Sequence, residues 1–535
     1  MALGLAAALQ VGVTLRSPVI AFDGVTFITI AQRLPFEPAK VIREHDQHPG
    51  YPALILATYW GVGRFLTGNS PLAWAASARL ASWLCGLLSV VVFWVFARRT
   101  FDARTAAVAT ILVATLPLLR RNAADGMSDT PQLLFYLLAA WMMKEGMASW
   151  RPWWFLGAGV SSGLAYWIRP EGLSVAIVGA VVLGIVFLRR QQPRWRVVAL
   201  SLATLVAATA LVAAPYVLIK GRLTSKKDYW QLLAPDQPAL GSPAPAQPAP
   251  PQRPAPPAGE PSRAERPDAD RPPAAAHPDG GTKAPALSSA LLKAFRAVGQ
   301  TFLNILRWEL LLPFAVGLFA RNRPKPQPPA GLLVLLLVLS HLALAFGLDL
   351  VAGYVGERHL IPVLVLLSPW VAAGVIRMAD WLGALGSARR RAGDGGSRRR
   401  WALWALMAAI VAVNSRACLG SLHGRHAGCR VAAAWVGAQA RPGDAVLSNS
   451  PYVPYYSGIS ALQVDTPERL AAALEAPGAS RFRFVVLFTK EGTLQPEWLA
   501  ALAGRYERVE IEGLDRCDTG RFRAVVFEAK GSQKP

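Results

Sequence analysis

Charged residues and cysteines are both scarce in this chain, and each scarcity removes a class of protein. Only 17% of the 535 residues are charged, whereas 53% are hydrophobic and the mean hydropathy is +0.31. This composition is too apolar for an ordinary soluble enzyme and indicates a protein whose solvent is the lipid bilayer. The four cysteines provide neither a disulfide framework nor a C-x-x-C pair for a metal.

Acidic residues are also few, since 33 Asp and Glu stand against 56 Lys and Arg and leave a net charge of +23. Such a charge can attract nucleic acid, but the basic residues lie in short clusters between apolar runs. They form no basic face interleaved with stacking aromatic side chains, so we expect no nucleic-acid partner.

Apolar runs that could cross about 30 Å of hydrocarbon recur along the chain. They lie near residues 2–20, 74–97, 105–118, 130–147, 153–168, 172–188, 197–219, 298–319, 331–349, 360–379 and 401–417. The sequence therefore predicts an α-helical polytopic membrane protein with about 11 transmembrane helices. The first run has an alternative interpretation as a signal peptide, but it lacks a basic n-region and we take it as the first helix.

Lys and Arg gather in alternate short loops, which predicts the orientation of the helices. The basic set includes Arg98 and Arg99, Arg189 and Arg190, and residues 389–391, and we expect it to be cytoplasmic. The opposite set comprises residues 23–71, 120–129, 221–289 and 349–359, the turn at Arg169, and the C-terminus. We therefore expect a multi-pass protein of the inner (cytoplasmic) membrane with a periplasmic C-terminal domain.

Two segments differ from the apolar runs. Residues 233–286 consist mainly of Pro and Ala, so we expect a disordered outer loop, either an insertion or a tether. Residues 430–535 alternate helical and strand patterns, which predicts a small soluble α/β domain on the outer face. Residues 1–429 then form the transmembrane module.

Ionisable residues gather on the predicted outer face at five places, where their cost in a membrane indicates a function. These are Asp23 in "DGVTFITIAQ", His48 in "HPGYP", Asp129 in "SDTPQLLFYLL", Arg169 and Glu171 in "YWIRPEG", and Arg358 and His359 in "ERHLIPVLVLL".

These five segments, in this order, resemble the GT-C glycosyltransferases. Within that superfamily they are most similar to bacterial relatives of the dolichyl-phosphate-mannose protein mannosyltransferases and to the aminoarabinose transferases. The sequence departs from the family pattern at Gly50, which stands where a second Pro is usual, at Gln132 in a Leu place, and at His359 in place of Tyr. The resemblance implies a GT-C-like helical bundle.

The implied activity is a polyprenyl-phosphate-dependent hexosyl transfer, with inversion, to a hydroxyl acceptor on a protein, lipid or glycan at the periplasmic face. The resemblance gives Asp23 the role of catalytic base, because one carboxylate must take the acceptor's proton as its oxygen attacks C1. Arg358, His359 and Arg169 are the implied ligands of the donor phosphate, since Arg binds phosphate through bidentate, charge-assisted bonds.

His48, Asp129 and Glu171 are the remaining candidates, for substrate binding. Each candidate also has a purely structural interpretation. Asp23 could cap a helix that begins at Val25, His48 could bond to backbone, and Arg169 and Glu171 could pair in a tight turn. Further alternatives are that Asp125 and Asp129 cap a helix or pair with Arg120 and Arg121, and that Glu357 orients Arg358.

A transporter or flippase of a lipid-linked or small anionic substrate is the alternative from another class. The absence of a visible internal repeat and the placement of charge at one surface count against it. His423, His426 and Cys429 have spacing that could suit a metal, but a fourth ligand is not evident, so we expect no metal site and no obligatory cofactor. The expected partners are thus a polyprenyl-phosphate-linked sugar, the bilayer and an unidentified hydroxyl acceptor.

Overall fold

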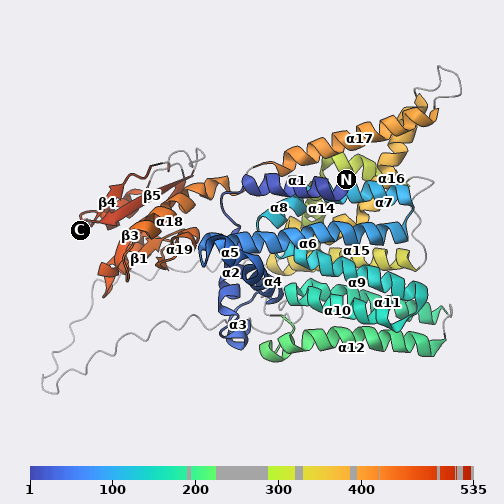
Figure 1. Cartoon of the computed structure of the whole chain (residues 1–535), viewed down its shortest axis with the longest axis horizontal. Helices are drawn as coiled ribbons and strands as arrows, with labels where there is room; N and C mark the ends of the chain where they lie inside the picture. The colour runs from blue at the N-terminus through green and yellow to red at the C-terminus, as the bar shows by residue number, and fades with distance from the viewer. Residues whose placement is uncertain are drawn as a thin grey trace.

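The computed structural model is a bundle of long helices with a small α/β domain beyond one end (Figure 1). The structure describes residues 1–189, 194–224, 287–319, 329–385, 395–420, 422–490, 494–512, 514 and 522–531. The Pro- and Ala-rich segment 233–286, for which we expect disorder, lies outside these residues, as does Cys517.

Each of the predicted apolar runs falls on a helix. The bundle contains α1 (Ala2–Leu15), α6 (Pro71–Thr100), α7 (Ala103–Thr115), α8 (Pro117–Ala124), α9 (Asp129–Ser149), α10 (Pro152–Ile168), α11 (Ser174–Leu188), α12 (Trp195–Lys220), α14 (Leu287–Phe319), α15 (Ala330–Ala352), α16 (Ile361–Leu385) and α17 (Gly395–Cys418). Two 3₁₀ turns, η2 (Pro170–Leu173) and η3 (Glu357–Leu360), lead into α11 and α16.

Among the described helices, fewer than the predicted 11 are both long enough and apolar enough to span a membrane. Within the described part of the chain, seven helices are long and apolar enough to cross a membrane. The count is eight if α7 and α8, bent by 44°, form one span. The predicted first span, 2–20, ends early: α1 stops at Leu15, and its 14 residues reach only about 21 Å. The predicted loop 120–129 is also partly helical, because Arg120 and Arg121 belong to α8.

The bundle core is made by apolar faces of α6, α7, α9, α11, α15 and α16. Small residues allow the closest helix contacts, as expected where lipid supplies little drive for association. A Cβ on Gly374 of α16 would lie 1.7 Å from the carbonyl oxygen of Pro313 in α14. Only glycine fits there, so α14 and α16 cross backbone to backbone.

Short helices cover the end of the bundle nearest the α/β domain (Figure 1). They are α2 (Phe22–Arg33), α3 (Pro38–Glu44), α4 (Gly50–Thr58), the π-helical turn η1 (Tyr59–Gly63) and α5 (Arg64–Thr67). The "HPGYP" segment enters α4, and a Cβ on Gly50 would lie 2.7 Å from the backbone carbonyl of Trp167. This contact explains why position 50 has glycine, since a side chain there would meet the backbone of α10.

The C-terminal domain has a five-stranded sheet with strand order β2-β1-β3-β5-β4. Its strands are β1 (Ala445–Ser448), β2 (Ser460–Gln463), β3 (Phe482–Lys490), β4 (Tyr506–Val509) and β5 (Phe522–Ala529). Its helices are α18 (Ala427–Gln439), α19 (Tyr452–Ser457), α20 (Pro467–Glu475) and α21 (Pro496–Leu502), with 3₁₀ turns η4 (Gly424–His426) and η5 (Ala479–Arg481). Strand β1 pairs in parallel with β2 and β3, whereas β5 runs antiparallel to β3 and β4.

Alternation along β3 explains the layers of this domain. Phe484 and Val486 pack with α18 on one face of the sheet, while Val485 and Leu487 pack with α20 and α21 on the other. Because successive strand residues point to opposite faces, a fully apolar strand is covered on both sides. The predicted α/β fold of this domain is confirmed.

Candidate active site

Asp23 lies in the first turn of α2, at the end of the bundle that faces the C-terminal domain. The N-cap of this helix is Ala21, and the cap has no side-chain hydrogen bond. The alternative interpretation of Asp23 as an N-cap is therefore wrong, since a capping side chain would precede the helix and accept from its free N–H groups. The carboxylate is left free for another partner.

That partner is Arg358, in the turn η3 that leads into α16. Its Nη1 lies 2.6 Å from Oδ2 of Asp23, and the two side chains are 35% and 36% exposed. A guanidinium carries five N–H donors in a planar fork, so Nη1 can hold Asp23 while its other edge meets an anion. One half-exposed pair thus offers a proton acceptor and a fixed positive charge.

The loop before Asp23 is held in place by two other parts of the protein. Arg79 of α6 donates through Nη2 to the carbonyl oxygens of Ser17 and Val19, at 2.9 and 3.0 Å. The backbone N–H of Ile20 donates to the hydroxyl of Tyr456 in α19, at 3.1 Å. Burial raises the pKa of the Tyr456 hydroxyl, so this group stays neutral at physiological pH. The C-terminal domain therefore helps to position Asp23.

His359 follows Arg358 and closes the same turn. Its Nδ1 accepts a hydrogen bond from the backbone N–H of Gly356 at 3.2 Å. With Nδ1 as the acceptor, the neutral ring carries its proton on Nε2. The predicted role of His359 in binding phosphate stays a prediction.

Asp129, Arg169 and Glu171 form a second, buried cluster. Arg169 Nη1 lies 2.7 Å from Asp129 Oδ1, and its Nη2 lies 2.9 Å from Glu171 Oε1. The side chains are at most 6% exposed. The turn η2 thus holds the Arg169–Glu171 pair that we considered as a structural alternative. Arg169 is thus already paired with two buried carboxylates, and the predicted site roles of the three residues stay predictions.

His48 is fully buried between α10 and α12. Its Nδ1 lies 2.8 Å from the carbonyl oxygen of Tyr166, its Nε2 lies 3.3 Å from Oγ1 of Thr224, and its ring stacks on Tyr216 at 4.4 Å. The contact with the Tyr166 carbonyl is the backbone hydrogen bond that we considered as the structural alternative for His48. The predicted substrate-binding role of His48 stays a prediction.

A further pair, which we did not predict, joins Asp125 to His423. Oδ2 of Asp125 lies 3.1 Å from Nε2 of His423, which precedes the C-terminal domain. A Cβ on Gly24 would lie 3.0 Å from the carbonyl oxygen of Asp125, so this pair adjoins the helix that carries Asp23. Nothing in the local sequence couples the two residues, which are 298 positions apart.

Within the described residues, no three or more His, Cys, Asp and Glu side chains gather as a metal-ligand set. The spacing of His423, His426 and Cys429 thus does not bring them together as ligands. His426 instead lies between the rings of Tyr452 and Phe488, each at 4.9 Å. Whether the reaction needs a divalent ion stays a matter of prediction.

We compared the chain with known protein families and curated proteins. A family model described as dolichyl-phosphate-mannose-protein mannosyltransferase matches residues 66–219. This range includes Asp129, Arg169 and Glu171 but neither Asp23 nor Arg358. No curated protein matches the sequence.

Solved structures match over much more of the chain. ArnT from Cupriavidus metallidurans in the apo state is 15% identical, with a TM-score of 0.56, over 98% of this chain and 96% of ArnT. ArnT bound to undecaprenyl phosphate gives the same identity and TM-score over 100% and 98%. An oligosaccharyltransferase from Archaeoglobus fulgidus, in complex with Zn and sulfate, is 12% identical, with a TM-score of 0.52, over 91% of this chain and 68% of its own.

The chain is thus a polytopic membrane protein with the GT-C glycosyltransferase fold. Its architecture is similar to that of ArnT along nearly the whole length of both chains.

Proposed function

We propose that this protein transfers a sugar from a polyprenyl-phosphate donor to a hydroxyl acceptor, with inversion, at the face of the membrane that carries Asp23. The observation that carries the proposal is the Asp23–Arg358 pair at the end of a GT-C bundle. Support for the donor class comes from the family match and from the similar ArnT, which binds undecaprenyl phosphate.

The proposed step uses each member of the pair once. The acceptor hydroxyl oxygen attacks C1 of the sugar, and its proton passes to the carboxylate of Asp23. The bond between C1 and the phosphate oxygen breaks, and that oxygen keeps the electron pair. The guanidinium of Arg358 stabilises the resulting phosphate charge through N–H donors not used on Asp23. The acceptor attacks C1 from the side opposite the phosphate. Because the proposed step is a single displacement with no covalent intermediate, the configuration at C1 is inverted.

The proposed location is the inner membrane, with the Asp23 face and the C-terminal domain in the periplasm. Support comes from the alternation of basic loops in the sequence. The hydrogen bond of Tyr456 to Ile20 and the pair of His423 with Asp125 also support a location of the C-terminal domain on the same face as Asp23.

The experiment that tests the function compares cell-envelope glycans, lipids and proteins by mass spectrometry in three strains. These are a strain with the intact gene, a strain without it, and one that expresses Asp23→Asn. Loss of the same glycosylated species in the second and third strains would support the proposal and identify the acceptor. An unchanged glycan profile without the gene would contradict it and favour the transporter alternative.

A further inference from the structure

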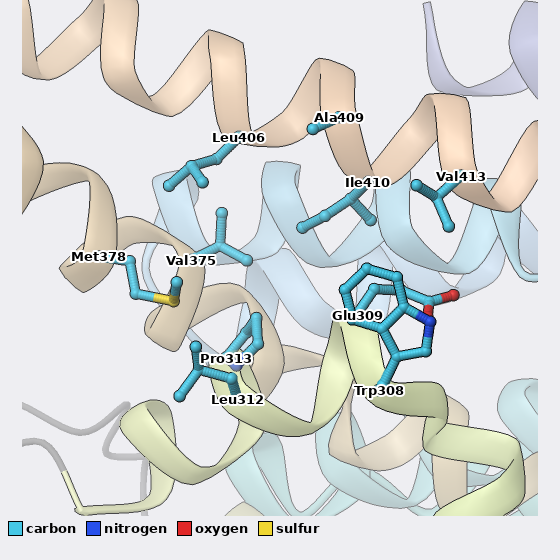
Figure 2. Close-up of a pocket in the computed structure, with 10 residues that line it drawn as sticks. All are labelled: Trp308, Glu309, Leu312, Pro313, Val375, Met378, Leu406, Ala409, Ile410 and Val413. Carbon is cyan, nitrogen blue, oxygen red and sulfur yellow. The ribbon is translucent and has the colours of Figure 1, made fainter.

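A cavity of about 240 Å³ opens between α14, α16 and α17 (Figure 2). Its walls are apolar, with Leu312 from α14, Val375 and Met378 from α16, and Leu406 and Ile410 from α17. Glu309 is the exception, and Figure 2 shows it beside Trp308 at one end of the cavity. The cavity is therefore amphiphilic, with one charged end.

Glu309 is a carboxylate that the bundle does not satisfy. Its side chain is 4% exposed, and among the described residues its Oε2 has neither a hydrogen bond nor an ion pair. It forms an ion pair with Nε of Arg307, whose side chain is 30% exposed. Arg307 has a φ of 55°, in the left-handed region, where it interrupts the helical geometry of α14. A buried carboxylate and a strained backbone are both costly, and both are more readily explained if the pair has a ligand.

The charged end of the cavity lies toward the membrane surface that carries Asp23. Val413, which is nearer to Cys418 at the end of α17 than the other α17 residues of the cavity, lies at the same end of the cavity as Glu309 and Trp308 (Figure 2). The linker that follows α17 leads to the contact between His423 and Asp125. Trp308 is 77% exposed, as is typical of aromatic residues at the level of lipid headgroups. The apolar walls then run from this surface into the hydrocarbon.

We propose that this cavity binds one membrane phospholipid whose headgroup carries both a phosphate and a primary amine. The ammonium group contacts the carboxylate of Glu309, the phosphate contacts the Nη groups of Arg307, which is paired with Glu309 through Nε, and part of an acyl chain fills the apolar cavity. Neither Asp23 nor Arg358 lines this cavity, and the proposal does not depend on the transfer reaction.

The paired charges select this lipid class. A headgroup of one negative and one positive charge can lie antiparallel to the Arg307–Glu309 pair, so that each charge meets its opposite. An anionic lipid without an amine leaves Glu309 facing a second negative group. A choline headgroup has the charge but no N–H, whereas an ammonium group offers three donors to the unsatisfied oxygens.

Native mass spectrometry of the purified, delipidated protein tests the proposal directly. The probes are phosphatidylethanolamine, phosphatidylcholine and phosphatidylglycerol with identical acyl chains, and farnesyl phosphate as a short polyprenyl phosphate. We expect phosphatidylethanolamine to bind about tenfold or more tightly than the other two phospholipids, which is the effect of one charge-assisted hydrogen bond. Equal binding of the three would overturn the proposal without any variant.

Two substitutions locate the site. Ala409→Phe places a ring in the cavity and should remove the bound phosphatidylethanolamine, whereas Ala408→Phe, at the adjacent exposed position that does not line the cavity, should not. Glu309→Gln should reduce the preference for the amine about tenfold, while Glu145→Gln, which breaks the Lys144–Glu145 pair of α9, should leave it unchanged. Unchanged binding in Ala409→Phe would refute the location. Displacement of phosphatidylethanolamine by farnesyl phosphate would instead assign the cavity to the chain of the sugar donor.

Discussion

Nη1 of Arg358 lies 2.6 Å from Oδ2 of Asp23, although 335 residues separate them in the sequence. This contact brings the turn η3, which leads into α16, onto the first turn of α2. It juxtaposes a carboxylate with a guanidinium whose remaining donors are available to a phosphate, as a transfer from a phosphate carrier requires.

Asp23→Asn should lower the rate of sugar transfer by about 100-fold to 10,000-fold, the range associated with general base catalysis. The amide keeps the size of the side chain but cannot accept the acceptor's proton. Protein yield, thermal unfolding and donor binding should hardly change. The matched control is Asp102→Asn, because Asp102 caps α7 and Asn caps equally well. A near wild-type rate in Asp23→Asn would overturn the mechanism and direct attention to Asp125, Asp129 and Glu171.

Arg358→Lys should weaken apparent donor affinity, since lysine keeps the charge but loses the planar fork. Arg358→Ala should weaken it further. Titration of the lipid donor in a transfer assay measures the effect. Arg469→Lys, in an exposed pair with Asp465 on the C-terminal domain, serves as the control. Donor affinity that is unchanged in both Arg358 variants would remove this residue from the site.

Arg169→Ala should destabilise the protein by about 3 to 5 kcal/mol, because it leaves the carboxylates of Asp129 and Glu171 buried without their cation. Thermal unfolding in detergent measures this loss. Arg469→Ala removes an exposed pair and should cost less than about 1 kcal/mol. If the two variants unfold alike, the buried cluster is not a structural element, and the predicted phosphate-binding role of Arg169 gains weight.

Tyr456→Phe should speed amide hydrogen exchange at Ile20 and its neighbours, because the variant lacks the oxygen that accepts the Ile20 N–H. Tyr455→Phe is the adjacent control, since the Tyr455 hydroxyl donates to the carbonyl oxygen of Pro71, at 2.7 Å, and not to the Asp23 loop. Equal exchange at Ile20 in both variants would show that the C-terminal domain does not fix this loop.

A reporter fused after Pro535 should be active in the periplasm, and one fused near residue 391 should be active in the cytoplasm. The physical reason is the concentration of Lys and Arg in one set of loops, which are retained on the cytoplasmic side. Alkaline phosphatase and a cytoplasm-active fluorescent protein provide the two measurements. The opposite pattern would invert the proposed orientation and put Asp23 on the cytoplasmic face.

The sequence by itself determined the class of this protein and the place of its principal elements. Apolar runs predict helices because the backbone of a membrane span must satisfy its own hydrogen bonds, and the alternating helix and strand patterns of residues 430–535 predict an α/β domain. Both signals are local, and both are found in the structure. The apolar run near 130–147 also predicted a helix, and α9 begins at Asp129.

Only the tertiary structure decided which ionisable residues meet. From the sequence, Arg169 and Arg358 are equivalent candidates for a phosphate, each before a Pro-containing helix entry. In the fold, Arg169 is buried between two carboxylates, whereas Arg358 is half-exposed beside Asp23. The same holds for His48, which packs between helices, and for Asp125, which meets His423 from 298 residues away. Pairing of charges depends on distance in space and on burial, and residues in different helices carry no local signal of either.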